Sequence, residues 1–226
     1  MDEALKNIDK LKNKFTTRED ILITFKKTMF NIVPVSAFTD NYIWVIHDQY
    51  HAVVVDPGEA KPVLDFLEQK KLKIIAILNT HHHVDHVGGN LKLLQQFQVP
   101  VYGPGSELIS TVTHCLKEGD SVYLSELSLR LSILDIPGHT AGHIAYYGAN
   151  LLFCGDTLFS CGCGRLFEGT AQQMYISLNK LAGLPDKTGV YCGHEYTYKN
   201  AEFCIKYDPE NINLKKKFET IKKLRS

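Results

Sequence analysis

The segment THHHVDH at residues 80–86 constrains this chain more than any other feature, because it crowds metal-binding side chains into seven positions. It follows an apolar run, KIIAILN, that is typical of a buried strand. Its spacing differs from the H-E-x-x-H pattern, in which one helix face presents both histidines to a zinc ion. We therefore predict a loop at the end of a strand. There His81 and His83 would face one ion, while Asp85 and His86 would reach a neighbouring position.

Further metal-binding side chains follow other predicted strands, in the segments PGHTAGH at 137–143, GDT at 155–157 and CGHEYT at 192–197. One catalytic zinc ion needs about three protein ligands and a water molecule. In two-metal sites a carboxylate bridges ions that lie roughly 3.5 to 4 Å apart. The strand ends supply more groups than one ion needs, so a binuclear centre is predicted. The candidate ligands are His81, His83, Asp85, His86, His139, Asp156 and His194.

Two neighbouring histidines are left out of this ligand set. His82 points away from its neighbours if the segment is extended, so we expect it to be exposed or to support the ligands. His143 is four residues after His139, but Pro137 and Gly142 argue against a helix that would align the two rings. Neither histidine is therefore predicted to bind metal.

From residue 30 onward, short runs rich in β-branched and aromatic residues alternate with helical segments. Residues 1–28 show helical spacing of apolar side chains and are predicted to be an N-terminal extension. The main domain is predicted at 29–197, followed by a helical region at 198–226. Strands are expected at 30–35, 42–47, 51–55, 73–79, 99–102, 121–124, 127–136, 144–147, 150–154 and 190–191, and helices at 61–69, 90–97, 198–207 and 211–224.

The composition narrows the choice of partner. Lysine and arginine total 25, as do aspartate and glutamate, so no overall charge favours nucleic acid or an anionic membrane. No apolar run approaches the roughly 18 residues of a membrane span. Six cysteines without a signal peptide indicate free thiols in a reducing cytoplasm. We expect a monomeric cytoplasmic protein with a small-molecule partner.

The chain resembles the metallo-β-lactamase superfamily, whose H-x-H-x-D-H signature stands here at residues 81–86. The resemblance is closest to the glyoxalase II branch, the hydroxyacylglutathione hydrolases, and runs from about Phe30 to the last residue. It is carried by NYIWVI (41–46), VVDPGEA (54–60), LNTHHHVDHVGGN (78–90), PGHTAGH (137–143), FCGDTLFSCGCGRLFEGT (153–170) and YCGHEYT (191–197).

The resemblance implies an α+β fold, a four-layer αββα sandwich with the metals at one edge and a short C-terminal helical appendage. Family members use zinc, iron or manganese, and zinc is expected here. The implied ligands are His81, His83 and His139 for one ion and Asp85, His86 and His194 for the other, with Asp156 bridging both. The helical C-terminal region of the family usually runs further than it does in this chain.

The resemblance also implies the activity, hydrolysis of S-(2-hydroxyacyl)glutathione, typically S-D-lactoylglutathione, in the degradation of methylglyoxal. Asp85 and Asp156 would hold the hydroxide shared by the two ions. Arg165 and Tyr196 match positions that contact the glutathione part of the substrate, while Phe167 stands where some relatives carry tyrosine. The alternatives are a persulfide dioxygenase with a single iron, and a thioesterase or lactonase of the same superfamily that acts on a substrate other than glutathione thioesters.

Overall fold

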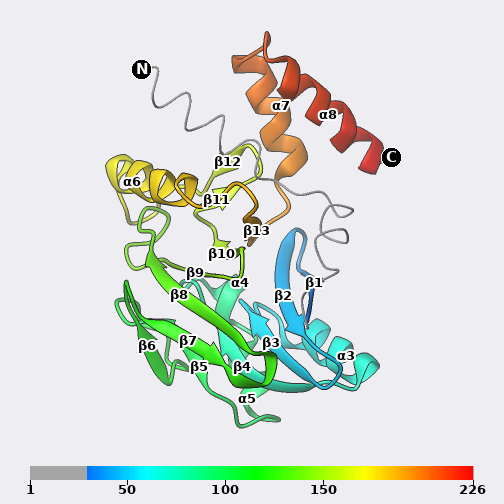
Figure 1. Cartoon of the computed structure of the whole chain (residues 1–226), viewed down its shortest axis with the longest axis vertical. Coiled ribbons are helices and arrows are strands. Elements are labelled where there is room, and N and C mark those ends of the chain that lie inside the picture. The colour runs from blue at the N-terminus through cyan, green and yellow to red at the C-terminus, as the bar shows by residue number, and fades with distance from the viewer. Residues whose placement is uncertain (1–29, 226) are drawn as a thin grey trace.

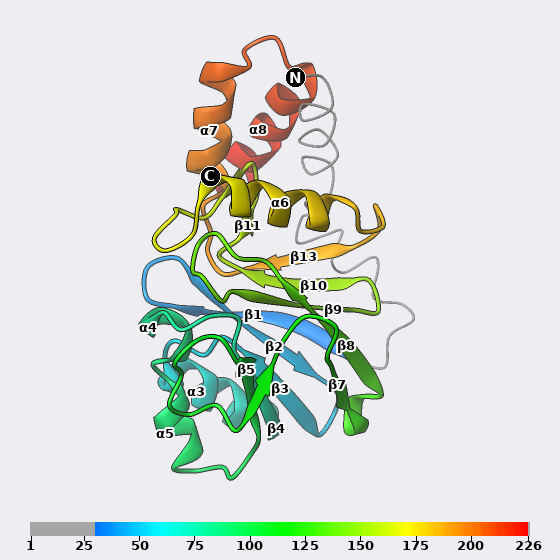
Figure 2. The ribbon, with the colours of Figure 1, turned by 90° about the vertical axis from the view of Figure 1, so that its left-hand side faces the viewer.

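Two β-sheets pack face to face and carry helices on their outer faces in the computed structural model, which describes residues 30–225 (Figures 1 and 2). The extension predicted at residues 1–28 lies outside the described residues. The first sheet has the order β1 (Asn31–Ala37), β2 (Asn41–His47), β3 (His51–Val55), β4 (Lys73–Leu78), β5 (Val101–Pro104), β6 (His114–Leu116). The second has the order β13 (Gly189–Cys192), β10 (Leu151–Gly155), β9 (Ile144–Gly148), β8 (Leu129–Asp135), β7 (Ser121–Leu124).

Strand direction determines where the loops of the site lie. In the first sheet, β3, β4, β5 and β6 run parallel, and β1 and β2 join them as an antiparallel hairpin. In the second sheet, β10 and β13 are parallel, while the other neighbours are antiparallel. A small hairpin, β11 (Leu158–Phe159) with β12 (Gly162–Cys163), follows β10. The carboxyl ends of β4 and β10 both open into loops of the site.

The alternation of side chains along each strand explains the layers. In β3, Val53 and Val55 face the second sheet, whereas Val54 faces α3 (Ala60–Lys70). In β10, Phe153 lies in the core between the sheets, and Leu152 packs on the outer side with Leu181 of α6 (Ala171–Ala182). Full burial of one such side chain stabilises the fold by about 1.5–3 kcal/mol.

Helices complete the layers and the appendage. α3 and α5 (Asn90–Leu94) cover the outer face of the first sheet, and α6 covers the second (Figure 2). The other helices are α4 (Val84–Val87), the 3₁₀ turn η2 (Ser125–Leu127), α7 (Thr197–Tyr207) and α8 (Ile212–Arg225). α7 and α8 pack against each other beyond the sheets (Figure 1). The predicted αββα sandwich with C-terminal helices is confirmed.

Some elements differ from the sequence-based expectation. α6 was not predicted, although Thr170 and Gln173 form a capping box, the signal of a helix start. The short strand β6 was also missed, and the helix expected at 90–97 ends at Leu94. Within residues 30–225, no helix is long and apolar enough to span a membrane.

Candidate metal centre

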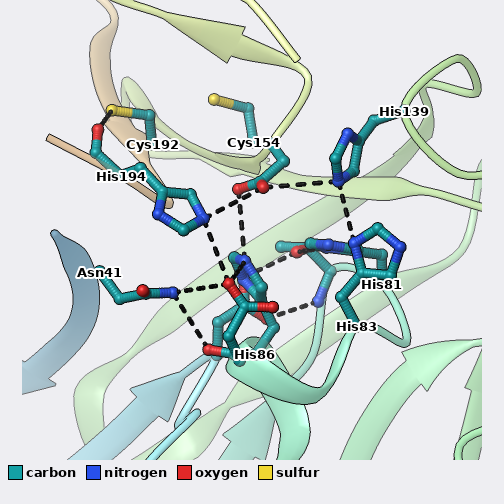
Figure 3. Close-up of polar contacts among 12 residues, drawn as sticks. Asn41, His81, His83, His86, His139, Cys154, Cys192 and His194 are labelled. Carbon is teal, nitrogen blue, oxygen red and sulfur yellow. Dashed lines mark hydrogen bonds and ion pairs between the residues drawn. The ribbon is translucent and has the colours of Figure 1, made fainter. Parts of the chain in front are cut away.

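The seven candidate ligands gather at one edge of the sandwich, where loops of both sheets meet (Figure 3). The first sheet supplies four of them from the segment that follows β4. The second sheet supplies His139 after β8, Asp156 after β10 and His194 after β13. Hydrogen bonds join the sheets beside the site, among them those from Ile144 N to Thr80 O at 3.0 Å and from the Tyr146 hydroxyl to Asn79 O at 2.9 Å.

Three histidines form what we term the first triad: His81, His83 and His139. Each offers one ring nitrogen, and these atoms lie within 4.8 Å of one another. Nε2 of His139 is 3.0 Å from Nδ1 of His83, and the side chains point toward one another in Figure 3. Three imidazoles that converge in this way provide a ligand set suited to one ion.

Asp85, His86 and His194 form the second triad, and their ligand atoms also lie within 4.8 Å of one another. Oδ2 of Asp85 is 3.4 Å from Nε2 of His194 and 3.6 Å from Nε2 of His86. Asp85 and His86 belong to the one-turn helix α4, where His86 N and Val87 N donate to His83 O. The loop predicted for the whole segment is therefore wrong at this point, because the turn closes its own hydrogen bonds.

Asp156 lies between the two triads. Its Oδ2 is 3.4 Å from Nε2 of His139 and 3.2 Å from Nε2 of His194, and its Oδ1 is 3.3 Å from Nε2 of His86. The carboxylate is buried. A carboxylate in this position can bind a metal ion in either triad, or bridge two ions.

The donor set fits divalent cations. His81 Nε2, His86 Nε2 and Asp156 Oδ1 are buried and form no well-aligned hydrogen bond among the described residues, although the last two lie 3.3 Å apart as an ion pair. A buried polar atom without a partner destabilises a protein by about 1–3 kcal/mol, so three of them at one point indicate a site shaped for another group. Imidazole and carboxylate ligands suit zinc, iron and manganese. The cluster is thus a site for divalent metal.

Burial and charge divide the histidines of the metal-free protein into two kinds. Burial lowers the pKa of His81 well below its ordinary value, so that ring is neutral. Burial also opposes a charge on His86, but Asp156 outweighs it and raises the pKa well above the ordinary range. The pKa of His194 is raised to about 10, again against burial, chiefly by hydrogen bonds to Asp156 and Asp85. Protons thus occupy positions that metal ions would take, and metal binding would release them.

Carboxylates behind the ligands fix the ring orientations. Asp56, just after β3, accepts from Thr80 N and Thr80 Oγ1 at 2.8 and 2.7 Å and lies 3.1 Å from His86 Nδ1. Both of its oxygens are therefore engaged, so it holds His86 rather than binding metal itself. Sequence reasoning missed Asp56, although its place at a strand end before Pro57-Gly58 was a usable signal.

The β1–β2 hairpin supports the second triad in the same manner. Asp40 Oδ1 lies 2.8 Å from His194 Nδ1, and Asn41 Nδ2 donates to Asp85 Oδ2 at 3.0 Å. Backbone bonds from Tyr42 N to Gly193 O and from Glu195 N to Asp40 O anchor the hairpin to the end of β13. Neither support residue was predicted, because the two partners are more than 40 positions apart in the chain.

The two histidines left out of the ligand set have other contacts. His143 is buried, stacks on His81 with ring centroids 4.5 Å apart, and accepts a hydrogen bond from Asp156 N through Nε2 at 3.2 Å. This stacking requires Gly155, which has φ +46° and whose Cβ would lie 2.8 Å from the His143 ring. His82 lies between the carboxylates of Glu107 and Glu168 instead.

The predicted substrate residues lie around the centre. The Arg165 guanidinium sits over the Phe167 ring, 5.2 Å from its centroid, and Phe167 makes edge contacts with His83 and His139. The ring of Tyr196 stacks on His194 with an interplanar angle of 5°. Burial and nearby carboxylates raise the pKa of Tyr196 to about 12, so its hydroxyl stays protonated.

These features define a class: a four-layer αββα protein with a divalent-metal site where its two sheets meet. The sequence pattern of the Metallo-beta-lactamase superfamily matches residues 38–194. A hydroxyacylglutathione hydrolase of Nitrosomonas europaea is 62% identical over 186 residues, which cover 82% of this chain and 71% of that protein. The chain belongs to the metallo-β-lactamase superfamily and, within it, to the hydroxyacylglutathione hydrolase family.

Solved structures agree with the fold. The crystal structure of ETHE1 from Myxococcus xanthus matches with a TM-score of 0.65 and 31% identity, covering 74% of this chain and 76% of that one. TTHA1623, solved in a di-iron-bound form, matches with a TM-score of 0.60 and 27% identity, covering 73% of this chain and 91% of that one.

Proposed function

We propose that this chain is a binuclear metal-dependent thioesterase that hydrolyses S-(2-hydroxyacyl)glutathione, such as S-D-lactoylglutathione, to glutathione and a 2-hydroxy acid. The observation that carries the proposal is the 62% identity to a protein named hydroxyacylglutathione hydrolase, over most of both chains. The His/Asp cluster at the edge of the sandwich supplies the matching chemistry.

The proposal assigns one ion to each triad, with Asp156 between them. Its support is that the ligand atoms of each triad lie within 4.8 Å of one another, and that Asp156 lies within 3.4 Å of members of both triads. The di-iron form of TTHA1623 is a precedent within the same fold. Zinc is our first expectation for the metal. Iron and manganese are the alternatives, because a histidine and aspartate donor set without thiolate does not select among the three metals.

When bound, two divalent ions lower the pKa of a shared water toward about 7 and polarise the thioester carbonyl. Asp85 and Asp156 are the acceptors that would hold and orient the attacking oxygen, since both carboxylates face the space between the triads. The leaving thiol has a pKa near about 8.5, so its expulsion needs little help from a protein acid. A thioester therefore suits this centre, because its cleavage does not depend on a protein acid in addition to the histidine and aspartate ligands.

Glutathione binding is assigned to Arg165 and Tyr196. Arg165 is exposed beside Phe167, and its planar guanidinium suits a substrate carboxylate. Tyr196 presents a neutral hydroxyl next to His194. Phe167 offers an apolar surface over His83 and His139, without the hydroxyl that some relatives carry there.

Elemental analysis of purified protein, together with hydrolysis of S-D-lactoylglutathione and of a thioester without glutathione, tests the proposal. We expect two metal ions per chain and a marked preference for the glutathione thioester. Equal rates on both thioesters would reject the substrate assignment. One iron per chain with oxygen consumption would instead identify the persulfide dioxygenase alternative.

Replacement of the bridging carboxylate tests the two-ion arrangement. Asp156→Ala should lose at least one ion and reduce kcat/KM by a factor of about 100 or more, because its oxygens approach both triads. Metal content and kinetics measured on the same preparation give both readouts. A variant that keeps two ions and near-normal turnover would exclude the bridging role.

A further inference from the structure

Glu107 is a buried carboxylate beside the candidate metal centre but outside the ligand set. It belongs to the connection between β5 and β6, and its side chain is only 3% exposed. Burial of a carboxylate is unfavourable unless the group is well hydrogen-bonded. The hydrogen bonds of its two oxygens therefore show which parts of the protein Glu107 holds together.

Each oxygen of Glu107 holds a different loop. Oε2 accepts a hydrogen bond from His82 N at 2.6 Å and lies 2.9 Å from His82 Nδ1. Oε1 accepts from the Thr140 hydroxyl and from Gly142 N, the latter at 3.1 Å. One carboxylate thus ties the segment after β4 to the segment after β8.

These two loops carry every member of the first triad. His82 stands between His81 and His83, and Thr140 directly follows His139. The residues that support the second triad are different ones, namely Asp40, Asn41 and Asp56. The segment after β4 also carries Asp85 and His86, but Glu107 contacts that segment at His82, between two members of the first triad. The other segment that Glu107 holds carries His139 and no member of the second triad.

We propose that Glu107 is a positioning residue that sets the geometry of His81, His83 and His139 and so determines the metal affinity of the first triad. This inference rests on the two-ion centre of the proposed function. Glu107 does so by holding the backbones of the two loops at a fixed separation. Supports of this kind typically contribute 10–100-fold to metal affinity.

An outer contact on the same histidine provides a matched comparison. Nε2 of His82 lies 3.2 Å from Oε1 of Glu168, whose side chain is 38% exposed, and Glu168 Oε2 accepts from Ala141 N. A half-exposed contact contributes less than a buried one. Glu168→Gln should accordingly change zinc affinity by less than about threefold, whereas Glu107→Gln should lower that of the first triad by about 10–100-fold.

The side-chain amide of Glu107→Gln keeps one acceptor oxygen but places an NH₂ group against one of the two loops. The variant therefore loses the bonds of one loop while retaining the size of the residue. Thr140→Val removes a single donor to Glu107, and Thr140→Ser retains it. This pair repeats the test without altering the buried carboxylate, and circular dichroism of the metal-free proteins checks that each variant is folded.

The test uses two single-triad backgrounds. His194→Ala disables the second triad and His83→Ala the first, and zinc affinity of each metal-free protein is measured by competition with a chromogenic chelator. Glu107→Gln should weaken zinc binding about 10–100-fold in the His194→Ala background and by less than about threefold in the His83→Ala background. Thr140→Val should follow the same pattern with a smaller loss, and Thr140→Ser should restore affinity.

Equal effects in both backgrounds would overturn the inference, because they would indicate general destabilisation. No effect of Glu107→Gln in the His194→Ala background would also overturn it. A parent protein that binds a single zinc ion would reject the two-ion centre and, with it, the inference. A parent that binds two ions but shows no selective effect of Glu107→Gln would reject the role of Glu107 alone, so the two failures can be distinguished.

Discussion

At the scale of single residues, the centre depends on the two nitrogens of each imidazole having different partners. His86, His139 and His194 direct one nitrogen into the site and the other to Asp56, the backbone oxygen of Arg165 and Asp40, respectively. Such partners fix the orientation of the ring and which nitrogen is available. These three candidate ligands are therefore oriented in the metal-free protein.

His143 must stay neutral, because one of its ring nitrogens has to accept a hydrogen bond. Its Nε2 accepts the Asp156 N–H, and burial lowers the pKa of the ring to about 3. Because this pKa is below that of an unfolded histidine, the unfolded chain binds the extra proton between about pH 6.5 and 3. Stability should therefore fall as the pH drops through this window.

We predict that His143→Gln flattens this pH dependence in the metal-free protein. The free energy of unfolding of the parent should decline more steeply with falling pH, by up to about 1.4 kcal/mol per pH unit, the amount for one proton. Urea unfolding at several pH values between 4 and 7 measures the slopes. Identical slopes would show that His143 does not take up the proton.

Arg165 allows binding to be separated from metal retention. Its backbone oxygen accepts from His139 Nδ1 at 2.7 Å, so a side-chain substitution leaves that support in place. Arg165→Ala should raise KM for a glutathione thioester about 10–100-fold, the equivalent of one charge-assisted hydrogen bond, with metal content unchanged. Arg165→Lys serves as the comparison that retains charge. An unchanged KM would exclude Arg165 from substrate binding.

At the scale of elements, α6 supports the loop that carries His139. Ser177 donates from its hydroxyl to Pro137 O at 2.7 Å, and Met174 packs on Gly138, where an added Cβ would lie 2.9 Å away. The helix begins with the Thr170–Gln173 capping box. Stability of the helix start thus bears on the position of the first triad.

Thr170→Ala should lower the free energy of unfolding by about 1 kcal/mol, because it removes the side-chain acceptor of Gln173 N. Thr170→Ser should retain most of that stability. Denaturant unfolding of the three proteins makes the comparison. If the alanine variant were as stable as the parent, the cap would contribute nothing to this helix.

At the scale of the whole molecule, the centre joins the two halves of the sandwich. Segments that follow strands of the first sheet supply His81 and Asp85, and those of the second supply His139, Asp156 and His194. A metal ion bound by either triad therefore links both sheets. Metal binding should accordingly stabilise the fold as a whole.

We predict that unfolding depends on free metal concentration. Each tenfold rise in free zinc above the dissociation constant should add about 1.4 kcal/mol per bound ion to the free energy of unfolding. Thermal unfolding in zinc–chelator buffers measures this effect. A midpoint that is the same in metal-loaded and chelated protein would contradict a link between the sheets.

The sequence was sufficient to predict most strands and to identify the candidate ligands. Apolar alternation predicts β3 and β10, and a dense run of histidines stands out in any sequence. It was less informative for α4, whose four residues are too few for a helical period, and for α6, whose capping signal was overlooked. Both helices were missed because their signals are local hydrogen bonds, which the spacing of apolar residues does not reveal.

The sequence by itself determined the chemistry available to this protein, because ligand types and their places at strand ends are properties of the chain. The resemblance also implied two sets of three ligands around Asp156, an arrangement that spacing along the chain does not give. Only the tertiary structure decided that Asp40, Asp56 and Glu107 hold the candidate ligands. The physical reason is that such supports join residues 25 to 154 positions apart. Hydrogen bonds across that separation depend on how the two sheets pack, and no local pattern encodes them.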